Sequence, residues 1–93
     1  MTQRELVIEN ARGLHARAAA RLVAVTSRFQ SRITLRRAGH LERIDGKSIL
    51  GILMMAASLG TRIEVSAEGV DEREAVDAVT ALFNAHFTEP VEP

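Results

Sequence analysis

The feature that most constrains the fold is the strict alternation of side chains between residues 62 and 68. Ile63, Val65 and Ala67 fall on one face of this stretch. The positions between and around them are polar: Arg62, Glu64, Ser66 and Glu68. Successive side chains of a β-strand point to opposite faces, so a period of two predicts a strand with one buried and one solvated face.

Two further stretches alternate in the same way, at residues 5–9 and 31–36. Their expected inward residues are Leu6, Ile8, Ile33 and Leu35. Residues 37–40 read as a turn, and residues 41–44 as the short returning strand of a hairpin. Strands with one polar face favour an antiparallel sheet, so we expect four such strands with the helices packed on the other face.

Helical spacing predicts a first helix from Ala16 to about Arg28. Its apolar positions are Ala18, Ala19, Leu22, Val23 and Thr26, closing on Phe29. A last helix is expected to open with Asp71 and Glu74 as a variant capping box. Its inward face is Ala75, Val76, Val79, Leu82 and Phe83. The chain order is therefore βαββαβα, an α+β open-faced sandwich with three helices on one face of a four-stranded antiparallel sheet.

A short helix is expected at residues 49–57, with Ser48 as its N-cap because a hydroxyl can accept from the unpaired first amides. It is apolar nearly all round, although a helix on a sheet buries only one side. The residues expected to face inward are Ile49, Ile52 and Ala56, and those expected at the surface are Leu50, Leu53 and Met54. Two interpretations remain open: an exposed apolar patch that binds another protein, or a core helix buried further by dimerisation.

The length and composition indicate one small domain over residues 1–88, followed by a frayed tail at 89–93. There are no cysteines, which fits a reducing compartment. No signal peptide is recognised, and the longest apolar run is too short to span a bilayer. We therefore expect a cytoplasmic monomer without membrane insertion.

Charge is distributed unevenly, although 12 basic and 12 acidic residues balance. No acidic residue occurs between Glu9 and Glu42. That interval instead holds many arginines: Arg12, Arg17, Arg21, Arg28, Arg32, Arg36 and Arg37. A basic side of this kind would steer an acidic protein or a phosphorylated group towards this part of the molecule.

The basic interval contains His15, which follows a loop and stands at the start of the first helix. Gly13 makes a sharp turn in that loop inexpensive. The first N–H groups of a helix lack intrahelical acceptors and favour an anion, and the same field disfavours a protonated imidazole. A neutral ring can act as a nucleophile, and the Arg17 guanidinium can bind phosphoryl oxygens in a fork. The alternative is that His15 is an ordinary surface or capping residue.

Two separated motifs, at residues 13–17 and 45–51, resemble the signatures of HPr, the histidine-containing phosphocarrier family of the phosphoenolpyruvate-dependent phosphotransferase system. The similarity covers nearly the whole chain, including residues 66–69. It implies the βαββαβα sandwich. It also implies that His15 takes a phosphoryl group from enzyme I and passes it to IIA proteins or domains, and that Arg17 assists. From the helix start itself, we expect the Ala16 and Arg17 amides to bind the phosphoryl oxygens.

The resemblance also implies regulation and a partner surface. Ser48 matches the serine that an HPr kinase/phosphorylase modifies in many bacteria, although its role as an N-cap alone explains it. The family's partner surface would include Ile49, Leu50 and Leu53, with Arg21 added. Ala18 departs from the family's usual proline, which fixes φ in the first helical turn. We expect a slightly looser loop, affecting the transfer rate rather than acceptance of phosphate.

Two other functions compete with this interpretation. A nitrogen-related branch of the same system would use this carrier for regulation instead of sugar uptake. A small nucleic-acid-binding module is disfavoured, because the chain has no Tyr or Trp and its three Phe residues occupy expected core positions. The three histidines have no metal-ligand spacing, so neither a metal nor a cofactor is expected.

Overall fold

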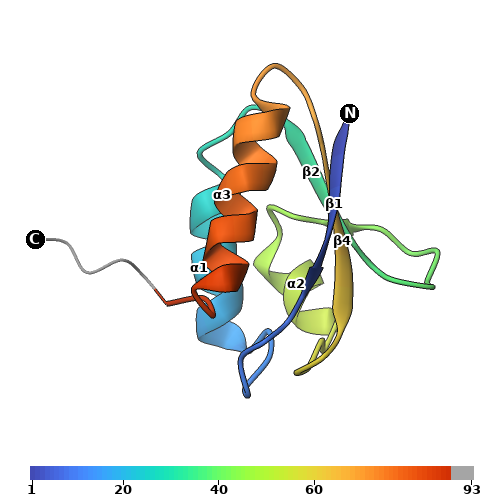
Figure 1. The fold of residues 1–93 in the computed structure, drawn as a ribbon, viewed down its shortest axis with the longest axis vertical. Coiled ribbons are helices and arrows are strands. Elements are labelled where there is room, and N and C mark those ends of the chain that lie inside the picture. Colours follow the sequence, from blue (N-terminus) through green and yellow to red (C-terminus); the bar gives the residue numbers. More distant parts are fainter. Residues whose placement is uncertain (89–93) are drawn as a thin grey trace, which may run out of the picture.

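The computed structural model describes residues 1–88, which form a four-stranded antiparallel sheet with three helices on one face (Figure 1). The predicted frayed tail at 89–93 lies outside the described residues. In chain order the elements are β1 (Thr2–Val7), α1 (Ala16–Thr26), β2 (Arg32–Arg37), β3 (Ile44–Asp45), α2 (Ile49–Met54), β4 (Arg62–Glu68) and α3 (Glu72–Asn84). The strand order is β1-β4-β2-β3. The predicted open-faced sandwich is confirmed.

The central strand is β4, which pairs with β1 on one side and β2 on the other. Leu6 lies opposite Ile63, and Leu35 lies opposite Val65, so the predicted inward residues meet under the helices. The polar residues of β4 lie on the open face, where Glu64 accepts from Arg36 at 2.9 Å. β1 begins earlier than the predicted 5–9, since Thr2 already pairs with Ala67 near the end of the seven-residue β4.

The predicted returning strand at 41–44 was largely wrong. Only Ile44 and Asp45 pair with β2, and Leu41 is 94% exposed. After β2 the Ala38 N–H still donates to Arg62 O of β4, and the chain then turns at Gly39 with φ +85° instead of returning along β2. The hairpin tip therefore projects from the sheet as a loop.

The helices follow the predicted faces more closely than the predicted ends. The inward residues of α3 are all buried: Ala75, Val76, Val79, Leu82 and Phe83. In α1, Val23 is only partly buried against the core, and the helix stops at Thr26. The Thr26 hydroxyl donates to Gly46 O at 2.8 Å, which fixes the end of α1 to the turn before α2.

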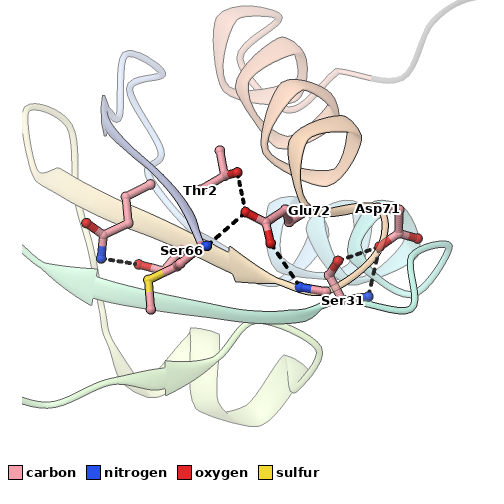
Figure 2. Close-up of polar contacts among 8 residues, drawn as sticks. Thr2, Ser31, Ser66, Asp71 and Glu72 are labelled. Carbon is pink, nitrogen blue, oxygen red and sulfur yellow. Dashed lines mark hydrogen bonds and ion pairs between the residues drawn. The ribbon is translucent and has the colours of Figure 1, made fainter.

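The predicted capping box at Asp71 was wrong. Asp71 precedes α3, but its carboxylate caps nothing in that helix. Its oxygens accept instead from the Gln30 N–H. They also accept from the N–H and the hydroxyl of Ser31 (Figure 2). Glu72 accepts from Thr2 Oγ1 and from the N-terminal amine at 3.1 Å. The carboxylates thus tie the start of α3 to distant segments of the chain.

The N-cap at Ser48 is confirmed, since its Oγ accepts from the Gly51 N–H at 3.1 Å. The helix α2 ends at Met54, not at residue 57, because Ala56 adopts a left-handed φ of +50°. The inward assignments of Ile49 and Ala56 were wrong. Only the middle of so short a helix reaches the core, where Ile52 is buried and Leu53 is half-buried rather than at the surface.

Candidate functional site

The loop between β1 and α1 is held in one shape. Gly13 has φ +62°, and a Cβ built there would lie 2.4 Å from the carbonyl oxygen of Ala57. The next residue, Leu14, is buried and donates its N–H to the same oxygen at 2.9 Å. Asn10 closes the turn, with its Nδ2 donating to Gly13 O at 2.8 Å. The loop is therefore fixed against the segment that follows α2.

This loop delivers His15 to the N-cap position of α1, with an extended backbone and a half-buried side chain. The first helical bond that reaches it runs from the Ala19 N–H to His15 O at 2.9 Å. The N–H groups of Ala16, Arg17 and Ala18 precede that bond and have no acceptor within the helix. The His15 side chain makes no capping hydrogen bond, so the structure gives no support to the capping interpretation.

The surroundings of His15 favour its neutral form. Partial removal of water from the ring lowers the pKa of His15 below its ordinary 6.5, and the positive charges of Arg12, Arg17 and Arg21 lower that pKa further. The neutral imidazole is therefore the main form at neutral pH, with one nitrogen lone pair available. The sequence reasoning counted Arg12 only as part of the basic interval and missed its influence on the ring; its spacing of three residues before His15 was the available signal.

The two helical arginines lie in different environments. Arg17 is exposed, and within residues 1–88 no hydrogen bond or ion pair engages its guanidinium. Arg21 is partly buried and donates from Nη1 to the carbonyl of Phe87 at 2.7 Å. Arg21, which was expected at a partner surface, therefore also holds the chain that follows α3. The ring of Phe87 packs on the ring of Phe83, with the two ring centroids 4.7 Å apart.

An apolar patch lies on α2. Its exposed members are Ile49, Leu50 and Met54, with exposed fractions of 44%, 68% and 75%. Leu53 is half-buried beside them, and Ser48 at the start of the helix is also half-buried. The helices α1 and α2 pack against each other, and the Leu14–Ala57 hydrogen bond places the His15 loop beside the chain that leaves α2.

Within 1–88 no group of three or more His, Asp or Glu side chains is arranged to hold a metal ion. In the same part of the chain, no helix is both long and apolar enough to cross a membrane.

The fold and the site define a small α+β protein that presents a neutral imidazole at a helix N-terminus among arginines, an arrangement suited to holding an anionic group. The family model described as "PTS HPr component phosphorylation site" matches residues 2–85. The chain belongs to the HPr family, the phosphocarriers of the phosphotransferase system. Members of this family are carriers rather than catalysts, and their partners lie within that system, such as enzyme I and IIA proteins.

Individual relatives agree with the family model. The chain is 45% identical to "Phosphocarrier protein HPr" of Xylella fastidiosa over 89 residues, covering 96% of this chain and 98% of that protein. It is 41% identical to "Phosphocarrier protein NPr" of Proteus mirabilis, covering 96% and 99%. Among solved structures, HPr from Thermoanaerobacter tengcongensis superposes with a TM-score of 0.88 at 37% identity, covering 98% of this chain and 100% of that one.

Proposed function

We propose that His15 is the phosphoryl acceptor, taking the group from phosphorylated enzyme I and passing it to IIA proteins or domains during sugar uptake in the cytoplasm. The observation that carries this proposal is a half-buried ring with a lowered pKa, standing where the amides of Ala16 and Arg17 have no helical acceptor. Arg17 is exposed and unengaged within 1–88, so it is available to bind the phosphoryl oxygens.

The proposed step is an in-line transfer. The lone pair of one ring nitrogen forms the N–P bond while the bond from phosphorus to the donor breaks, and its electron pair stays on the donor. The ring proton on the other nitrogen remains or passes to water. Because the ring starts neutral, it needs no deprotonation before attack. The Ala16 and Arg17 N–H groups and the Arg17 guanidinium stabilise the charge on the phosphoryl oxygens.

Partner binding is proposed to use Arg17 together with the apolar patch of α2, in particular Ile49, Leu50 and Leu53. Arg21 adds positive charge to this side while its Nη1 holds the Phe87 carbonyl. Complexes would be transient, with the arginines speeding association with acidic partners. We propose that the free carrier is a monomer.

Ser48 is proposed as a regulatory phosphorylation site for an HPr kinase/phosphorylase. Its hydroxyl already lies at the N-terminus of α2, where a dianion is stabilised by the helix dipole. The added charge would lie beside the apolar patch and weaken binding of partners that bury the patch or carry carboxylates.

A second candidate function is the nitrogen-related branch, which the 41% identity to a protein named NPr favours. Transfer from the phosphorylated chain to sugar-specific and nitrogen-related IIA acceptors, compared under equal conditions, separates the two. A nucleic-acid-binding role has less support, since Phe83 and Phe87 are buried and Phe29 is half-buried.

The acceptor assignment is tested by incubating the protein with phosphoenolpyruvate and enzyme I and mapping the acid-labile phosphoryl group by mass spectrometry. We expect it on His15 and expect His15→Ala to fold normally but accept nothing. His86→Ala is the matched control and should accept phosphate as the wild type does, because His86 is exposed and lies after α3. A phosphoryl adduct on the His15→Ala protein would contradict the assignment of His15 as the acceptor.

A further inference from the structure

Arg12 lies in a hydrogen-bonded turn, three residues before the proposed acceptor. It lies inside the turn that the Gly13 N–H closes on Asn10 O at 3.1 Å, and Asn10 Nδ2 clamps the far side of that turn. Gly13, which follows it, lies so close to Ala57 that a Cβ there would be 2.4 Å from the Ala57 carbonyl oxygen. Three residues of chain can separate its Cα from that of His15 by at most about 11 Å. The loop thus brings the base of the Arg12 side chain within reach of the ring.

The guanidinium of Arg12 is also available to bind a ligand. The residue is exposed, and no hydrogen bond or ion pair within residues 1–88 engages it. The nearest acidic residue in sequence, Glu9, has its Oε1 3.8 Å from His86 Nε2. The Arg12 charge nevertheless acts on the His15 ring, as the first of the three arginines that lower its pKa. A positive group whose charge acts on the ring, and which has no partner within residues 1–88, is placed to meet an anion on that ring.

We propose that Arg12 is a second phosphoryl-binding guanidinium, which contacts the oxygens of a phosphoryl group on His15 from the loop side while Arg17 approaches from the first turn of α1. This inference rests on His15 being the acceptor. Arginine can bind two phosphoryl oxygens at once through its planar fork. Holding the phosphoryl group from both sides stabilises its dianion and slows its loss to water.

The test uses phosphoramidate, a small chemical phosphoryl donor, so that enzyme I binding plays no part. The phosphorylated wild type, Arg12→Gln, Arg12→Lys and Arg28→Gln proteins are followed by 31P NMR across pH and by the rate of phosphate release. Arg28 is a matched control, because it is an exposed arginine just after α1. Its guanidinium makes no hydrogen bond or ion pair within 1–88 and is not among the charges acting on His15. Thermal melts check that each variant folds.

For Arg12→Gln we expect the phosphoryl pKa to rise by a few tenths and phosphate release to accelerate about 2- to 5-fold, the range for one solvent-exposed charge pair. Arg12→Lys should recover part of both effects, and Arg28→Gln should match the wild type. Equal behaviour of Arg12→Gln and wild type, or an equal change in Arg28→Gln, overturns the role of Arg12 and leaves the acceptor intact. A wild type that takes no phosphoryl group on His15 overturns both proposals.

Discussion

At the scale of single residues, the backbone conformation of Gly13 determines the position of His15. An alanine there would need a left-handed backbone, which costs about 1–2 kcal/mol, and its Cβ would meet the Ala57 carbonyl oxygen at 2.4 Å. We expect Gly13→Ala to lower the free energy of unfolding by more than about 2 kcal/mol and the Tm by roughly 10 °C or more. Denaturant and thermal unfolding measure these changes.

Gly39→Ala is the matched control. Gly39 has φ +85°, but no atom lies within 4 Å of the position of its missing Cβ, so this variant incurs only the backbone strain. The difference between the two variants reports the Gly13–Ala57 contact itself. Equal losses of stability would mean that the close approach at Ala57 relaxes without cost and does not hold the loop.

At the scale of elements, α2 depends on its cap. A helix of six residues has few internal hydrogen bonds, so the bond from the Gly51 N–H to Ser48 Oγ is a large share of its local stability. We expect Ser48→Ala to cost about 1 kcal/mol and Ser48→Gly only a few tenths, because glycine tolerates the cap position. Hydrogen exchange of the Gly51 amide should accelerate in the alanine variant. Unchanged exchange would show that packing of Ile52 alone fixes the helix.

The elements also show what sequence patterns can and cannot predict. The alternation at 62–68 predicted β4 and its inward face, because a half-buried strand shows apolar and polar residues in a local period of two. The same reasoning placed His15 at a helix start and Ser48 as a cap. It failed where a distant group competes: Asp71 is bonded to Ser31, 40 residues away, instead of capping its own helix. The bond from Arg21 to the Phe87 carbonyl, 66 residues apart, likewise has no local signal.

At the scale of the whole molecule, two carboxylates beside each other join three parts of the chain. Asp71 holds the segment between α1 and β2 through Gln30 and Ser31, and Glu72 holds the start of β1 through Thr2 and the N-terminal amine (Figure 2). The Ser31 hydroxyl and the Gln30 amide lower the pKa of Asp71. The Thr2 hydroxyl, the Gly69 amide and the N-terminal amine lower the pKa of Glu72 to about 2.

These lowered pKa values predict a loss of stability in acid. A carboxyl group whose pKa is lower in the folded state than in the unfolded chain stabilises the fold at pH values above its unfolded pKa. As the pH falls below that value, the unfolded chain binds protons more readily than the folded chain, and the contribution to stability is lost. For Glu72 the contribution is complete above about pH 4.5 and declines as the pH falls from there towards 2. Asp71 acts in the same direction. Denaturant unfolding between pH 2 and 7 should therefore show stability rising with pH through this window.

Variants assign that pH dependence to the two carboxylates. Glu72→Gln and Asp71→Asn should each reduce the stability at pH 7 and flatten its decline below pH 4.5, since one titrating group is gone. Glu74→Gln is the control. This carboxylate lies in the same first turn of α3, is exposed and makes no hydrogen bond or ion pair within 1–88, so its removal should leave the slope unchanged. If all three variants kept the wild-type slope, the acid response would arise elsewhere. Because the two carboxylates join segments remote from His15, phosphoryl acceptance at pH 7 should survive their loss.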